Sequence, residues 1–334
     1  MMMSTHAEVD VSVVVPTYRR PALLERCLQA LLAQTLAPRC YEILVVDDGH
    51  DEATRELVQS YAARALHPRI RYQRPSAGRG PAVARNCGWR AACAAVVAFT
   101  DDDTQPDAQW LQQGLATLLL HRDWVAAAGR VRVPRAPGAG DRPTDHELMT
   151  RGLETAEFVT ANAFVWREAL QKVDGFDERF LRAWREDSDL HFRLLQVGAV
   201  GRAPQALVWH PVRPERWGVS LRQQRNVFFD ALLHRKHPRA YRERVRPVPP
   251  WDYYVIVALT LAAPGLALAG WPRLAALGLG VAAALVLRVA WRRLRVTSHE
   301  PGHVLEMLAT SAAIPFLSVY WRLRGAWHFR TPFL

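Results

Sequence analysis

The chain has 334 residues, of which half are hydrophobic and 22% are charged, and its formal net charge is +11. This length allows roughly two folded units, and this composition excludes a disordered, collagen-like or coiled-coil chain. The four cysteines, at positions 27, 40, 87 and 93, lack the spacing of a zinc site or a disulfide scaffold. Such a positive charge indicates an anionic partner: nucleic acid, a membrane surface or a phosphorylated substrate.

The first hundred residues predict alternating strands and helices. Residues 11–15 are a continuous β-branched run, and apolar residues then recur at helical spacing from Leu23 to Leu32, after Pro21. The alternation continues with a helix at 52–66 and another at 82–95, separated by strands at 43–46, 70–73 and 96–99. Further along, we expect helices at 107–120 and 186–197 and strands at 124–133, 158–165 and 206–209. This order predicts an α/β fold with a mostly parallel, doubly wound sheet.

Hydropathy changes near residue 250. Residues 253–271 carry no charge, and residues 274–291 are interrupted only by Arg288. Each segment is long enough to cross a hydrocarbon core of about 30 Å, and tryptophans and tyrosines stand at the ends, so we expect a transmembrane helical hairpin. A third apolar segment, 304–321, contains Glu306 and a proline. We expect it to be an interfacial or re-entrant helix.

The arginines gather on both sides of this hairpin. They are dense at 213–246 and again at 288–295, next to apolar runs, which favours an anionic membrane surface. Nucleic acid is not expected as a partner, because no recognition helix or stacking sheet is evident. Residues 217–237 are amphipathic and predict a helix on the bilayer, with a plain surface helix as the alternative. The basic flanks place residues 1–250 on the cytoplasmic side of the inner membrane.

Two acidic clusters follow predicted strands, at Asp47–Asp48 and at positions 101–103. Ligands of open α/β sheets bind at the carboxyl ends of strands. Asp101 and Asp103 flank one residue, a spacing that lets both bind one hard metal ion and its phosphate oxygens. A solvated acidic turn is the alternative. No glycine-rich phosphate loop follows the first strand, which argues against a dinucleotide oxidoreductase and a P-loop NTPase.

A third cluster, REDSDL, opens the predicted helix at 186–197. Asp187 lies three and seven residues before Leu190 and Leu194, so we expect it to face inward with them, as a cap or as a functional carboxylate. Asp189 has Arg193 four residues on and is expected to be a salt-bridged surface residue.

Six motifs in order, over about residues 10–211, resemble glycosyltransferase family 2, which has the GT-A nucleotide-sugar fold. They are VVVPTYRRPALLERCLQALLAQT, YEILVVDDG, ARNCGWRAA, VVAFTDDDTQPD, VDGFDERF and REDSDLHFRL. The resemblance implies seven donor-binding residues: Pro16, Tyr18, Asp48, Arg85, Asn86, Asp101 and Asp102. It implies a divalent metal, Mn²⁺ or Mg²⁺, held by Asp101, Asp103 and His210, although a capped strand end explains His210 equally well. Asp187 would be the general base of an inverting displacement.

The resemblance and the apolar segments together imply three regions: a GT-A domain at 10–212, a basic juxtamembrane segment at 213–250 and a membrane region at 251–324. The expected activity is sugar transfer from a nucleotide-sugar donor to a lipid-linked or membrane-proximal acceptor in cell-envelope glycan synthesis. The Q-x-x-R-W motif of processive synthases is replaced by QQRNV at 223–227, which argues against polymer synthesis. Two alternatives stay open: a polyprenyl-phosphate monoglycosyltransferase, and a non-catalytic nucleotide-sugar-binding subunit.

Overall fold

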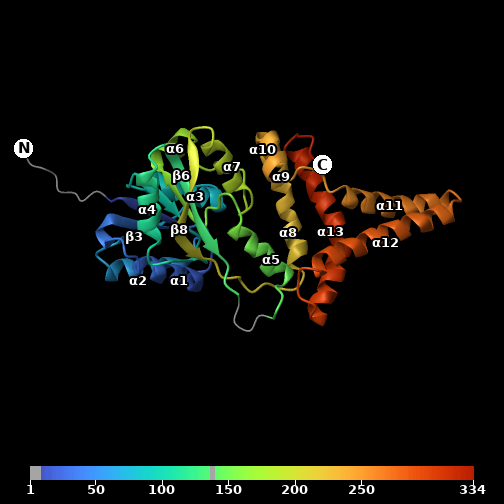
Figure 1. Cartoon of the computed structure of the whole chain (residues 1–334), viewed down its shortest axis with the longest axis horizontal. Coiled ribbons are helices and arrows are strands. Elements are labelled where there is room, and N and C mark those ends of the chain that lie inside the picture. Colours follow the sequence, from blue (N-terminus) through green and yellow to red (C-terminus); the bar gives the residue numbers. More distant parts are fainter. Residues whose placement is uncertain (1–8, 136–139) are drawn as a thin grey trace, which may run out of the picture. The chain divides into compact units, whose positions relative to one another are not determined.

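The computed structural model describes residues 9–135 and 140–334, and the chain divides into two compact units (Figure 1). The α/β unit comprises Met1–Pro134 and Arg151–Pro211, as far as these residues are described. The helical unit comprises Arg135–Thr150 and Val212–Leu334. The chain therefore passes from the α/β unit into the helical unit twice, after Pro134 and again after Pro211.

The α/β unit is built on one mixed sheet, whose described strands follow the order β3-β2-β1-β4-β7-β6-β8-β5. The bounds are β1 (Val11–Thr17), β2 (Tyr41–Asp47), β3 (Arg69–Gln73), β4 (Val96–Phe99), β5 (Gln105–Pro106), β6 (Trp124–Arg132), β7 (Ala163–Trp166) and β8 (Ala199–Trp209). Strands β3, β2, β1 and β4 are parallel, as are β6 and β8. Strand β7 runs antiparallel to both of its neighbours. The predicted mostly parallel sheet is confirmed, with two reversed strands: β7 near its middle and β5, antiparallel to β8, at its edge.

Helices cover both faces of this sheet. They are α1 (Pro21–Leu32), α2 (Glu52–Arg64), α3 (Pro81–Ala91), α4 (Trp110–Leu120), α6 (Arg167–Lys172) and α7 (Glu186–Leu194). Val13 of β1 packs on one side with Leu28 of α1, and Val14 packs on the other side with Trp89 of α3. Because both faces are buried, β1 is a continuous hydrophobic run rather than an alternating one.

Helix α3 lies very close to β1. A Cβ atom on Gly88 would stand only 2.4 Å from a methyl group of Val14, so a larger residue would push the helix away from the sheet. The glycine of the ARNCGWRAA motif therefore sets the depth of the helix that carries Arg85 and Asn86.

One expected strand is much shorter than predicted. Residues 158–162 leave the ladder before β7 begins, because the buried side chain of Asn162 takes over hydrogen bonds there. Its amide nitrogen donates to the carbonyl oxygens of Arg130 and Ala206, each at 2.9 Å, and its oxygen accepts from Trp110 Nε1 at 2.8 Å. Other elements begin or end a few residues from their expected bounds; β8, for example, begins seven residues earlier, at Ala199.

The helical unit contains the C-terminal helices and most of α5 (Asp145–Arg151). The others are α8 (Val219–Gln223), α9 (Val227–Lys236), α10 (Pro238–Arg244), α11 (Trp251–Leu268), α12 (Pro272–Leu294) and α13 (Pro301–His328). Helices α11 and α12 form the expected hairpin, which turns at Gly270 with a φ of +86°. Among the described residues, α11, α12 and α13 are long and apolar enough to cross a membrane.

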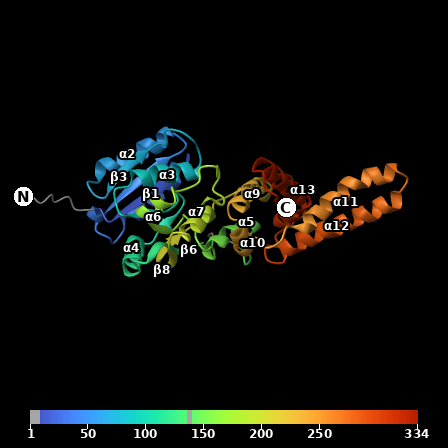
Figure 2. The same ribbon diagram turned by 90° about the horizontal axis from the view of Figure 1, so that it is seen from above.

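Helix α13 is one continuous helix and extends beyond the expected segment 304–321 at both ends. In both views it crosses the open end of the hairpin rather than extending along it (Figures 1 and 2). Its buried residues include the polar Thr310, Ser311, Ser318 and Arg322, whereas Leu305, Leu323 and Trp327 are exposed. This arrangement fits the expected interfacial helix, which stays a prediction.

The amphipathic segment 217–237 contains α8 and α9. Its apolar side chains Phe229, Leu232 and Leu233 are buried, and a Cβ atom on Gly325 of α13 would stand 2.7 Å from the carbonyl oxygen of Phe228. Part of the apolar face of this segment therefore packs on α13. Its expected position on the bilayer stays a prediction.

Candidate functional site

The candidate site lies at the carboxyl ends of β1, β2 and β4, where the acidic clusters follow their strands. His210 joins it from the end of β8, and its backbone N–H donates to the carbonyl oxygen of Arg132 at the end of β6, at 2.8 Å. Residues far apart in the sequence thus meet at one edge of the sheet, as expected for an open α/β fold.

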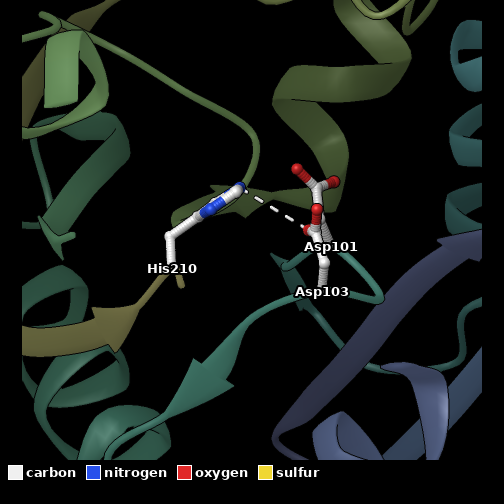
Figure 3. A group of neighbouring side chains, drawn as sticks. All are labelled: Asp101, Asp103 and His210. Atoms are coloured by element: carbon white, nitrogen blue, oxygen red, sulfur yellow. Dashed lines mark ion pairs between the residues drawn. The ribbon is translucent and has the colours of Figure 1, made fainter. Parts of the chain in front are cut away.

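Asp101, Asp103 and His210 form a compact cluster (Figure 3). One ligand atom from each lies within 4.8 Å of the others, and His210 Nε2 stands 3.5 Å from Asp103 Oδ1. Two carboxylates and an imidazole are a suitable donor set for a divalent ion such as Mn²⁺. The ring of His210 is nearly buried, and its Nδ1 has no hydrogen-bond partner among residues 9–135 and 140–334. These residues fit a divalent cation, which when bound would neutralise charge on phosphate oxygens.

Asp102, the middle residue of the run, is engaged elsewhere. Its side chain is buried, accepts a hydrogen bond from Thr17 Oγ1 at 2.8 Å and pairs with Arg20 at 3.3 Å. Burial and the neighbouring charge of Asp103 raise the pKa of Asp102 to about 6. Asp102 therefore ties the end of β1 to the loop after β4, and its predicted contact with the donor stays a prediction.

The two aspartates that follow β2 also differ. Asp47 is fully buried and holds the turn, accepting from the backbone N–H groups of Gly49 and Asp51 and from the Tyr72 hydroxyl at 2.7–2.8 Å. Asp48 accepts from the Gly80 N–H through Oδ2 at 2.8 Å. Its Oδ1 is buried and accepts no hydrogen bond from any part of the chain that the structure describes. A carboxylate oxygen in that state is suited to accept from a ring N–H of a bound base.

Pro16 and Tyr18, the other expected nucleoside contacts, lie at the end of β1. Pro16 is a residue of the strand itself and is paired with Val46 of β2. The ring of Tyr18 is half-exposed at 50%, so one face is available for stacking. Both roles stay predictions.

Arg85 connects the cluster of Asp101, Asp103 and His210 to α7. Its buried guanidinium donates to Asp101 Oδ1 at 2.7 Å and to Glu186 Oε1 at 3.0 Å. The sequence analysis placed Arg85 near the donor but assigned no role to Glu186. No local spacing reveals this pair, because the two residues are 101 positions apart.

Asn86, also expected near the donor, is buried and fully hydrogen-bonded. Its nitrogen donates to the carbonyl oxygen of Phe176 and to Glu178, and its oxygen accepts from the N–H groups of Phe176 and Trp89, all at 2.8 Å. These bonds hold the VDGFDERF segment against α3. A direct contact with the donor stays a prediction.

Helix α7 carries the expected base. Asp187 is half-buried in the first turn and accepts from the Ser188 N–H at 2.7 Å, and burial raises its pKa. The expected exposure of Asp189 is wrong, since this side chain is fully buried, although its ion pair with Arg193 is confirmed at 2.7 Å. Arg193 also donates to the carbonyl oxygen of Gly175 at 2.6 Å, which places the pair under a neighbouring loop.

Glu186 should make the fold sensitive to pH. Burial, followed by the nearby charge of Asp187, raises its pKa from about 4.5 to about 8, against the opposing effect of Arg85. The folded protein therefore binds this proton more tightly than the unfolded chain does. The stabilisation that protonated Glu186 provides is present at low pH and is lost as pH rises toward 8. We expect the thermal unfolding midpoint of the EDTA-treated chain to fall across this window. The free energy of unfolding should fall by at most about 1.4 kcal/mol for each pH unit crossed.

The matched variant for this prediction is Glu186→Gln, which cannot release a proton. Its unfolding midpoint should change less with pH than that of the wild type. Equal slopes for the two proteins would contradict the assignment of this pH dependence to Glu186.

The model of glycosyl transferase family 2 matches residues 12–178, half of the chain. The chain belongs to glycosyltransferase family 2. Glycosyltransferase AglE of Haloferax volcanii is 27% identical over 224 residues, which cover 65% of this chain and 71% of that protein. Validoxylamine A glucosyltransferase of Streptomyces hygroscopicus subsp. limoneus is 31% identical over 248 residues, which cover 64% of this chain and 52% of the glucosyltransferase. The chain described here thus spans about half the length of the glucosyltransferase.

A solved structure supports the fold of this family 2 protein. Mannosyltransferase PcManGT from Pyrobaculum calidifontis, in complex with GDP-Man and Mn²⁺, superimposes with a TM-score of 0.56 at 19% identity. The match covers 95% of this chain and 87% of the mannosyltransferase. At this identity the likeness concerns the fold alone, and the expected GT-A fold followed by apolar helices is confirmed.

Proposed function

We propose that this protein is a membrane-anchored, metal-dependent, inverting glycosyltransferase that uses a nucleotide-sugar donor and a lipid-linked acceptor in cell-envelope glycan synthesis. The observation that carries the proposal is the bridge formed by Arg85. It links Asp101 of the Asp-Asp-His cluster to Glu186, the neighbour of Asp187. One site thereby combines a place for a metal-bound diphosphate with a carboxylate able to accept a proton.

The donor side is suited to a nucleoside diphosphate sugar. Asp48 offers a buried oxygen that has no hydrogen-bond partner among the described residues, and Tyr18 offers a half-exposed ring. Asp101, Asp103 and His210 would hold a divalent cation, which would supply positive charge for the diphosphate. The GDP-Man and Mn²⁺ bound to PcManGT support the same class of ligands here.

The proposed reaction is a single displacement. The acceptor hydroxyl transfers its proton to Asp187 as its oxygen bonds to the anomeric carbon of the sugar. The bond between that carbon and the diphosphate oxygen breaks, and the nucleoside diphosphate leaves with inversion at the carbon. Arg85 keeps the metal ligand Asp101 in place. The positive charge of the bound cation would therefore be positioned before negative charge develops on the leaving diphosphate.

Three observations weigh on the acceptor and the alternatives. The apolar helices α11, α12 and α13 favour an acceptor with a lipid tail. A carboxylate at position 187 favours a hydroxyl acceptor over an already ionised polyprenyl phosphate, which needs a base less. The presence of Asp48, Asp101, Asp103 and Asp187 disfavours a binding subunit that has lost its catalytic groups.

A donor screen tests this function. Membranes that contain the full chain are incubated with labelled nucleotide sugars and Mn²⁺, and label is counted in the lipid extract. Label from one donor identifies the sugar. Release of the label by mild acid as a free monosaccharide indicates a sugar phosphate, whereas label that stays joined to the acceptor sugar or lipid indicates a glycosidic product. Donor binding without transfer, for every sugar tested, would instead support the non-catalytic alternative.

The orientation of the α/β unit can be tested through Cys93, its exposed cysteine; the other three cysteines are buried or half-buried. If this unit faces the cytoplasm, a membrane-impermeant maleimide should label Cys93 in inside-out vesicles but not in intact spheroplasts. The Cys93→Ser chain reports background labelling of the remaining cysteines. Labelling of Cys93 in intact spheroplasts would place the unit on the outer side.

A further inference from the structure

The helical unit buries an arginine that the proposed reaction does not use. Arg322 of α13 is 1% exposed. Its guanidinium lies over the ring of Phe333, 5.0 Å from the ring centre. Its Nε and Nη1 atoms have no hydrogen-bond partner within the described part of the chain. A buried charge whose donors are only partly hydrogen-bonded is costly, and a cation–π contact offsets only part of that cost.

The charged side chains that act on Arg322 include one carboxylate and one further arginine. The charge of Asp230 acts on Arg322 more strongly than that of Arg246. Asp230 is already engaged, since its Oδ2 accepts from the Tyr241 hydroxyl at 3.2 Å. The charges of both arginines also act on Tyr254 in α11, whose hydroxyl is buried and has no partner within residues 9–135 and 140–334. The unpaired donors therefore belong to Arg322 of α13 and Tyr254 of α11. The other charged groups that act on them are Arg246 and Asp230.

Two of these groups lie nearer the surface of the helical unit than Arg322 does. Arg246 and Tyr254 are half-buried rather than enclosed. Trp251, at the start of α11, is more than half exposed, and its ring lies 5.8 Å from that of Tyr254. Exposed tryptophans at the ends of apolar helices lie at the level of lipid headgroups.

We propose that Arg322, Arg246 and Tyr254 form a binding site for a phosphate oxyanion, supplied by a lipid headgroup or by free phosphate. Guanidinium groups bind phosphate through paired N–H donors, which the unpartnered Nε and Nη1 of Arg322 provide. Arg246 adds charge and Tyr254 adds a third donor. The site belongs to the helical unit, shares no residue with the site at the ends of the strands, and does not depend on the proposed function.

The full chain in neutral detergent provides the test, through its thermal unfolding midpoint. Sodium phosphate is compared with sodium chloride at equal ionic strength, and dihexanoyl phosphatidic acid with dihexanoyl phosphatidylcholine. A ligand at a hundred times its dissociation constant should raise the midpoint of the wild type by about 5 °C. A rise with phosphate indicates a site for the free ion. A rise only with phosphatidic acid indicates a lipid headgroup.

Arg322→Gln removes the charge and should weaken phosphate binding about 10–100-fold. Arg324→Gln is the matched control, because Arg324 lies on the same helix but is exposed, and it should respond like the wild type. If Arg322→Gln does not fold, Tyr254→Phe removes one donor without changing the charge and should reduce the rise. The proposal is wrong if neither phosphate nor phosphatidic acid stabilises the wild type, or if the Arg322 and Arg324 variants respond alike.

Discussion

The Asp187→Asn variant is expected to lose turnover by a factor of about 10²–10⁴ and to bind the donor as the wild type does. The amide has nearly the same shape but cannot accept the acceptor proton. Its oxygen can still accept the hydrogen bond from the Ser188 N–H, so the first turn of α7 should be preserved. Turnover in the donor screen and donor affinity by calorimetry measure the two effects separately.

Asp174→Asn is the matched control for this variant. Asp174 precedes α7 in the chain, its side chain is 95% exposed, and its φ of +56° is one that asparagine tolerates. The control should keep full turnover. Retained turnover in Asp187→Asn would move the role of base to another group, and a parallel loss of donor affinity would show that Asp187 holds the site together instead.

The sheet and the location of the site could be predicted because both depend on local patterns. Buried β-branched runs separated by helical repeats indicate parallel strands, and the acidic groups follow directly from strands β2 and β4. The antiparallel strand β7 could not be predicted in this way, because strand direction is set by connections across the fold. Its shortness depends on Asn162, whose partners Arg130 and Ala206 lie 32 and 44 positions away.

The role of each carboxylate was harder to predict than its position. Helical spacing placed Asp187 on an inner face and Asp189 outside, but this argument considers the helix alone. In the fold, Arg193 donates to a neighbouring loop and keeps Asp189 buried beside it. Glu186 is buried because Arg85 of α3 pairs with it. Such pairs between distant segments leave no spacing signal in the sequence of a single chain.

The three consecutive aspartates should respond differently to the same substitution. We expect Asp103→Asn to lose Mn²⁺ affinity and to lower turnover about 10²–10³-fold, because it removes a charged ligand from the cluster with Asp101 and His210. EDTA should abolish turnover of the wild type, and Mn²⁺ or Mg²⁺ should restore it. Free Mn²⁺ measured by electron paramagnetic resonance reports metal binding without reference to activity.

Asp102→Asn is the adjacent control, and its expected effect is of another kind. Its carboxylate faces Thr17 and Arg20 rather than the metal cluster, so Mn²⁺ affinity should be unchanged. Because burial raises the pKa of Asp102 to about 6, removal of its charge should not lower the unfolding midpoint at pH 7, and the variant should lack the loss of stability that the wild type shows as pH rises from about 4 to 6. Equal losses of Mn²⁺ affinity in the Asp102 and Asp103 variants would mean that the whole acidic run binds the ion. Turnover that survives EDTA would remove the proposed metal role of Asp101 and Asp103.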